Sequence, residues 1–317
     1  MPTYHPALIA HLRTHHGIVA RRAAIALGLT TRQLDALVEV GELVIMFEGV
    51  YRHALWPATM LSRCAALCAA DPSIVICCGT AALLWSFRRC TSKLIHVTTT
   101  STGFVVTMGN GEVLHRCRVM PPDHVHERPD GIRVTSPART MFDLAKHVRW
   151  TDLESAIEQG LRRDQFDVPT LYAVGRLLCR RGRSGSRLFA EVLESRPAFR
   201  RPVDSHPELV LLKALTQVGV RLDAQVTLAL PNGAVIHPDL GDPTIGFYVE
   251  IDDHEWHGGR LDATYDDRRD RHVRLGGARV ERVSTDEVRT SLPQIVAELA
   301  DAYRQQRSAS LSHRPAV

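Results

Sequence analysis

The sequence predicts a mixed α+β protein built of several domains. The chain opens with a helix, a tight turn, a capped helix and a hairpin pattern at residues 42–53, which is typical of a winged helix-turn-helix. Residues 55–150 mix helix and strand patterns in an α/β middle region. From residue 204 the expected order is helix, three strands, helix and strand, αβββαβ, with a last helix after it.

Composition places the chain among globular proteins. Its 317 residues suffice for two or three cores, and 44% of them are hydrophobic. No apolar run approaches the roughly 20 residues that span a bilayer. The N-terminus lacks a signal-peptide pattern because His5, His11 and Arg13 interrupt it. We therefore expect a cytoplasmic protein with no membrane partner, and its seven cysteines, including the adjacent Cys77 and Cys78, indicate reduced thiols.

The net charge of +4 is unevenly distributed. Residues 204–317 carry 13 Lys and Arg against 18 Asp and Glu, a net charge of −5. The remaining 26 and 17 give residues 1–203 a net charge of +9. A basic region beside an acidic site suits a protein in which one module binds a polyanion and a second module cuts phosphodiesters.

The N-terminal domain is expected at residues 1–54. Apolar spacing predicts a helix over 6–15 and a second helix over 20–26. Thr30 and Gln33 have the spacing of a capping box that begins a third helix, which extends to about Val40. A hairpin wing then follows around Glu48 and Gly49.

Six side chains of this domain are candidates for DNA contact. We expect two to meet phosphates, three to enter a groove and one to lie on the wing: Arg21 and Arg22, then Thr31, Arg32 and Gln33, then Arg52. The alternative is a winged helix that binds protein, since Asp35 and Glu39 on the third helix would oppose a phosphate backbone.

The stretch HHGIVARRAAIALGLTTRQLDALVEVGELVIMFEGVYRH resembles the winged-helix domain of AbiEi-type antitoxins of type IV toxin–antitoxin systems. The middle region at 55–150, with GIRVTSPARTMFDLA near its end, resembles the region that follows in those proteins. The resemblance implies repression of the chain's own promoter and a cognate toxin as partner. The spacing of His115, His124 and His126 gives no catalytic set, so we expect these histidines to lie on the surface or to pack against other side chains. Arg139 is expected to pair with Asp143.

Residues 151–203 are expected to form a helical basic linker. Arginines cluster in the stretch RRGRSGSR, and we expect Arg180, Arg181 and Arg183 to follow a nucleic-acid backbone. The alternative is a solvated face or a simple linker, which is the common role of such a charge run.

A candidate metal site lies in the last domain, at residues 204–307. Residues 245–251 read as a buried strand, and alternation places Glu250 and Asp252 on one face. Residues 235–240 read as the neighbouring strand, so that Asp239 and Glu250 meet if the two strands pair. Crowded carboxylates are usually neutralised by a cation. The alternative is a polar strand end whose acids are solvated separately.

The arrangement of PD in HPDL, ten intervening residues and E-x-D in YVEIDDHEWH resembles the PD-(D/E)XK nuclease superfamily, in particular endonuclease domains similar to very-short-patch-repair enzymes. The resemblance implies a restriction-endonuclease-like fold and Mg²⁺ or Mn²⁺ bound by Glu208, Asp239 and Glu250. Asp252 stands where the superfamily has lysine, and His257 is the candidate that would replace it in catalysis. An inactive relic is the alternative that this departure leaves open.

Two functions follow from these patterns. The first is a DNA-binding protein with a metal-dependent endodeoxyribonuclease domain, acting in phage defence or DNA repair. The second is a non-catalytic antitoxin-like repressor that keeps the nuclease fold as a scaffold. The oligomeric state stays open, with a homodimer expected by analogy with winged-helix repressors, and residues 308–317 are expected to form a disordered tail.

Overall fold

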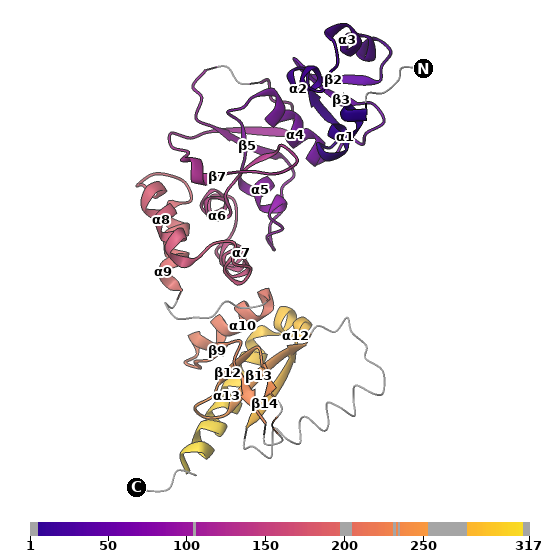
Figure 1. Cartoon of the computed structure of the whole chain (residues 1–317). Coiled ribbons are helices and arrows are strands. Elements are labelled where there is room, and N and C mark those ends of the chain that lie inside the picture. Colours follow the sequence, from indigo (N-terminus) through magenta and orange to yellow (C-terminus); the bar gives the residue numbers. More distant parts are fainter. Residues whose placement is uncertain are drawn as a thin grey trace. The chain divides into compact units, whose positions relative to one another are not determined.

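A computed structural model describes residues 6–103, 106–196, 205–230, 233, 235–252 and 278–312 (Figure 1). The chain divides into two compact units, one made of residues 1–153 and 166–191 and the other of residues 154–165 and 192–317. Among the helices described, none is long and apolar enough to cross a membrane. The mixed α+β character expected from the sequence is confirmed.

The first unit begins with three helices and a three-stranded antiparallel sheet of order β1-β3-β2. The elements are α1 (Pro6–Thr14), β1 (Ile18–Ala20), α2 (Arg21–Ala26), α3 (Thr31–Glu39), β2 (Leu43–Phe47) and β3 (Val50–His53). The predicted capping box is present, because the Thr30 hydroxyl accepts from Gln33 N and the Gln33 side chain accepts from Thr30 N. The hairpin expected over 42–53 is formed by β2 and β3, and β1 adds a strand that sequence analysis did not predict.

The middle region contributes a five-stranded sheet of order β6-β5-β4-β8-β7. Its elements are α4 (Met60–Ala70), β4 (Val75–Ile76), α5 (Cys78–Leu84), β5 (Ile95–Thr99), β6 (Glu112–Arg116), η1 (Pro122–His124), β7 (Val125–Glu127), β8 (Arg133–Thr135) and α6 (Pro137–Leu144). Strands β5 and β6 are parallel, as are β4 and β8, whereas β4 and β5 are antiparallel.

One hydrophobic core joins the N-terminal sheet to the middle region. Helix α4 packs against β1 and β3, and its buried Leu67 belongs to the same cluster as Ile18 of β1 and Ile76 of β4. The N-terminal sheet and the middle region therefore share one packed core. Residues after α6 form α7 (Trp150–Arg162), α8 (Val168–Leu178) and α9 (Ser186–Ser195), and α9 lies where the sequence predicted the later part of a linker.

The second unit contains a four-stranded sheet of order β14-β13-β12-β9. Its elements after residue 204 are α10 (His206–Gln217), β9 (Asp223–Ala224), β10 (Leu228–Ala229), β11 (Val235–Ile236), β12 (Leu240–Asp242), β13 (Phe247–Asp252), β14 (Arg279–Ser284), α12 (Thr285–Thr290) and α13 (Leu292–Ser312). The helix predicted over 262–275 lies outside the described residues. Helix α13 extends to Ser312, so residues 308–312 are helical where a tail was expected.

The core of this unit fixes β13 between a helix and its neighbouring strands. Phe247 is fully buried and meets Tyr303 of α13 edge to face, with ring centroids 5.5 Å apart. On β12, Gly241 pairs with Tyr248, and a Cβ at Gly241 would come within 2.5 Å of the Tyr248 ring. Glycine at this position therefore lets the Tyr248 ring lie across β12, which holds β12 and β13 in register.

Replacing Phe247 with alanine should destabilise the second unit by about 3–5 kcal/mol, because it removes a fully buried ring and leaves a cavity beside Tyr303. Calorimetry of the full chain measures the effect. The control is Val235→Ala, a 53% exposed site, which should change stability by less than about 0.5 kcal/mol. Equal effects of the two substitutions would contradict this packing.

Candidate functional site

The acidic residues predicted for the last domain lie around the ends of β12 and β13. Leu240 pairs with Val249 in an antiparallel register. Continuing that register by one step sets Asp239 opposite Glu250. Residues 235–240 were expected to form one strand beside β13, but only Leu240–Asp242 pair with β13, whereas Val235 and Ile236 pair with β10.

Glu208 reaches the same neighbourhood from α10. It is the third residue of the helix, which begins with Ser205 as its cap, and it is buried. The Gln225 side chain donates to Glu208 Oε2 at 3.3 Å, and Gln225 N donates to Asp239 O at 2.7 Å. Gln225 therefore links the Glu208 carboxylate to the backbone carbonyl of Asp239, and its own φ of 52° places its backbone in the left-handed region.

Protein donors contact the carboxylates of Asp239 and Glu250 as well. Asp239 Oδ2 accepts from Ile251 N at 2.7 Å. Arg282 of β14 lies beside Glu250 in the parallel register and donates to Glu250 Oε2 at 3.4 Å. The sequence prediction missed Arg282 and Gln225, because each comes close to an acid only through the fold.

The fit to a divalent cation is partial. Carboxylate oxygens are the donors that Mg²⁺ and Mn²⁺ prefer. In the part of the chain that the structure describes, however, Asp239, Glu250 and Glu208 do not form a group whose ligand atoms all converge within 4.8 Å. Asp252 ends β13 and is exposed, and His257 lies outside the described residues.

The candidate DNA-contacting residues of the N-terminal region divide into two groups. Arg22, Thr31, Arg32 and Gln33 are exposed on α2 and α3. Arg21 instead pairs with Asp35 at 2.8 Å and donates to Tyr51 Oη at 3.1 Å, and Arg52 donates to Trp56 O. The charge of Asp35, which was expected to oppose DNA, therefore has a partner within the chain.

The basic run after α8 is an ordered turn. Arg180 and Arg181 are exposed, and Arg180 donates to the carbonyls of Arg176 and Cys179. Arg183 is half-buried, donates to Leu178 O at 3.1 Å and lies over the Phe142 ring at 4.7 Å, and burial lowers the pKa of its guanidinium. Of the three predicted residues, Arg180 and Arg181 are the more available to a polyanion.

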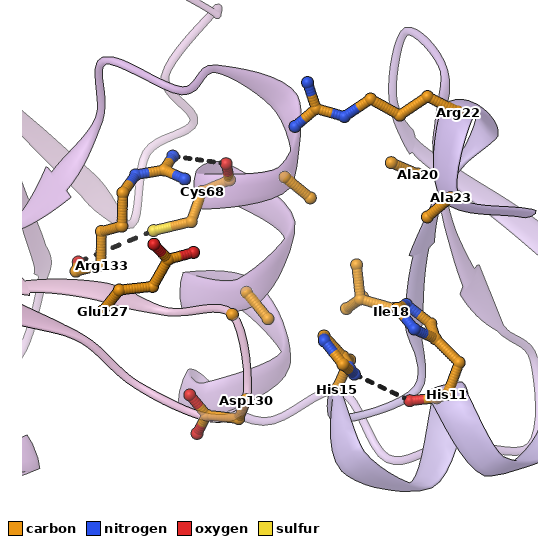
Figure 2. Close-up of a pocket in the computed structure, with 13 residues that line it drawn as sticks. His11, His15, Ile18, Ala20, Arg22, Ala23, Cys68, Glu127, Asp130 and Arg133 are labelled. Atoms are coloured by element: carbon orange, nitrogen blue, oxygen red, sulfur yellow. Dashed lines mark hydrogen bonds between the residues drawn. The ribbon is translucent and has the colours of Figure 1, made fainter. Parts of the chain in front are cut away.

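A pocket of about 170 Å³ lies between the N-terminal elements and the middle region (Figure 2). His11 and His15 stack along one wall, with ring centroids 3.8 Å apart, and Arg22 reaches over from α2. On the other wall Arg133 donates to Cys68 O at 2.6 Å. Asp130 completes the junction, because its carboxylate contacts His16 Nε2 at 2.9 Å.

The remaining predictions about the middle region concern packing. Arg139 and Asp143 form the expected pair, at 3.0 Å, with both side chains buried. His124 is buried 3.3 Å from Arg139, and burial followed by that positive charge lowers its pKa. His126 packs on Trp85, with ring centroids 5.1 Å apart. These two histidines pack as predicted, whereas His115 belongs to a separate cluster described below.

Comparison with known proteins gives the middle region a family likeness. Residues 74–174 match the family model described as the AbiEi antitoxin C-terminal domain, which supports the AbiEi-like part of the predicted resemblance. No curated protein matches the chain. The comparisons give no support to the very-short-patch-repair-like part.

Three chains of solved structures match. One is the crystal structure of the RV2827C protein from Mycobacterium tuberculosis, with 15% sequence identity and a TM-score of 0.41, covering 62% of this chain and 78% of that one. A TM-score this low defines no shared fold.

Asp239 accepts a hydrogen bond from the backbone, so a test of the acidic site must distinguish a loss of stability from a loss of catalytic activity. Replacing Asp239 with alanine leaves the N–H of Ile251 without this acceptor and should cost about 1–3 kcal/mol of stability. Asp239→Asn keeps an oxygen in place and should cost less. Urea unfolding of both variants measures the difference, and equal losses would show that the hydrogen bond contributes nothing.

Proposed function

We propose that this chain is a DNA-binding, antitoxin-like protein whose N-terminal residues 6–53 contact DNA and whose middle region resembles AbiEi antitoxins. The observation that carries the proposal is the match of residues 74–174 to the AbiEi antitoxin C-terminal domain. It stands directly after a helix-turn-helix pattern with a hairpin. A cognate toxin is the protein partner that this family likeness implies.

The local geometry of α3 supports DNA contact. The capping box at Thr30 fixes where the helix begins, so that Thr31 and Arg32 project from its first turn. Side chains at the start of a recognition helix are the ones that reach base edges in the major groove. The Arg21–Asp35 pair offsets an acidic charge on the same helix, which reduces repulsion of phosphates.

Arg32→Ala should weaken binding to the DNA upstream of the chain's own coding sequence by roughly 10-fold, the scale of one lost base contact. Fluorescence anisotropy at fixed salt, with scrambled DNA as competitor, measures this. The matched control is Arg289→Ala, an exposed arginine of the second unit with a side chain 70% accessible, which should bind like the unchanged protein. Equal binding by both variants would remove α3 from the interface.

A second candidate function is phosphodiester hydrolysis by the second unit. The observation favouring it is the register that sets Asp239 opposite Glu250, with Glu208 connected through Gln225. A bound Mg²⁺ would polarise a phosphate and acidify a water molecule. In this reading Asp239 and Glu250 would hold the ion, and Arg282 would offset the charge that remains on Glu250. The alternative is that the second unit is a scaffold without catalytic activity.

Plasmid incubated with the full chain and Mg²⁺ or Mn²⁺ should be nicked if this second function holds, and Glu250→Gln should reduce the rate by at least about 100-fold through loss of an ion ligand. The control is Glu281→Gln on the adjacent strand, where the carboxylate pairs with Arg279. Nicking that persists in Glu250→Gln, or is absent from the unchanged chain, would favour the scaffold.

A further inference from the structure

Four side chains that can ligate a metal ion converge in the middle region. They are Cys78, His96, His115 and His147, and one ligand atom from each lies within 4.8 Å of all the others. A tetrahedral zinc ion with bonds of about 2.0–2.3 Å needs its ligand atoms roughly 3.3–3.8 Å apart. Small movements of the side chains would bring the four ligand atoms to these distances.

The fold brings these residues together from four separate elements. Cys78 begins α5, His96 lies on β5, His115 lies on β6, and His147 follows the end of α6. Cys77 N donates to His96 O, and His96 N donates to the Thr80 hydroxyl, both at 2.9 Å, so the start of α5 is fixed against β5. Because β5 and β6 are parallel with Thr98 opposite His115, the two strand histidines point from the same face.

The three imidazoles surround the thiol closely. His96 Nδ1 lies 3.0 Å from His115 Nε2, and their rings stack with centroids 5.3 Å apart. The His147 ring centroid lies 5.2 Å from that of His96 and 5.9 Å from that of His115. Cys78 is fully buried, the two strand histidines are half-buried and His147 is exposed, so an ion has access from the His147 side.

The backbone at Cys78 also departs from ordinary geometry. Its φ of 52° lies in the left-handed region, which a residue with a side chain adopts only at a cost in free energy. Strained positions of this kind concentrate at ligand sites, where the surrounding structure holds them. The conformation directs the Cys78 thiol toward the three histidines, while the adjacent Cys77 lies outside the ligand group.

The donor set suits a zinc ion, because it combines one thiol with three imidazoles. The Sγ atom of the adjacent Cys77 lies 3.4 Å from that of Cys78. The thiolate is the form of cysteine that binds metals.

We propose that Cys78, His96, His115 and His147 form a zinc site that ties α5, the β5–β6 pair and the end of α6 together. Four protein ligands leave no open coordination position, which is the pattern of a structural zinc site rather than a catalytic one. Lys146 Nζ lies 3.4 Å from His115 Nδ1. Ligation through Nε2 requires a proton on Nδ1, so Lys146 must withdraw when the ion binds.

The test begins with the full chain as purified. After dialysis against buffer without chelator, elemental analysis should give one zinc per chain, and removal of zinc by a strong chelator should lower the melting temperature, which added Zn²⁺ restores. The chelated protein titrated with Co²⁺ should develop the visible bands of a tetrahedral site and a thiolate-to-cobalt absorption. Failure to bind either metal would overturn the proposal.

Variants then assign the ligands. His147→Asn changes an exposed residue with little risk to folding and should weaken Zn²⁺ binding by about 100-fold or more, beyond the loss typical of an outer-shell partner. Cys78→Ser should abolish the thiolate-to-cobalt absorption. The matched control is Cys77→Ala, the neighbouring buried thiol, which should retain both the metal and the absorption. Metal retained by His147→Asn, or a thiolate band lost in Cys77→Ala, would refute this ligand set.

Discussion

The packing of α4 is the constraint on which the first unit depends. One helix buries residues against the N-terminal sheet and against the middle sheet, so that Ile18, Leu67 and Ile76 belong to one core. The junction is reinforced by polar contacts, in which Asp130 holds His16 and Arg133 donates to three carbonyls around the end of α4. Gly131, with a φ of 77°, lets this turn approach His15 closely. The N-terminal elements are therefore packed on the middle region through one shared core.

Local signals allowed most elements to be predicted from the sequence. The Thr30–Gln33 capping box and the apolar face of the first helix fixed α3 and α1, because capping and helical periodicity are properties of neighbouring residues. Strands of three residues, such as β1 and β7, carry too little pattern to be distinguished from loops. Helix α9 was not predicted for a different reason, because the arginines before it indicated a solvated linker. In the structure its buried Phe189 packs edge to face on Phe142.

The two candidate sites differ in how far sequence could anticipate them. The strand alternation around Glu250 and the neighbouring PD segment led to the prediction that Asp239 and Glu250 meet, and the observed pairing of β12 with β13 begins one residue after Asp239, at Leu240. The hydrogen bonds from Gln225 and Arg282 depend on register and on the parallel addition of β14, which the residues alone do not specify. The Cys78 and histidine cluster gave no recognisable spacing at all. Its ligands come one at a time from four elements, so only the folded sheet unites them.

The chemistry of the donors separates the two sites physically. In the second unit, Asp239 accepts a backbone N–H and Glu250 faces Arg282, so the protein itself already offsets part of the negative charge. The proximity of these acids is therefore compatible with a non-catalytic scaffold as well as with a cation site. In the first unit the convergent groups are a thiol and three imidazoles, beside the positive charge of Lys146. Nitrogen and sulfur donors of this kind select zinc and similar ions over magnesium. The stronger physical case for a metal therefore lies in the region that resembles an antitoxin, and not in the acidic region where the sequence motif first indicated one.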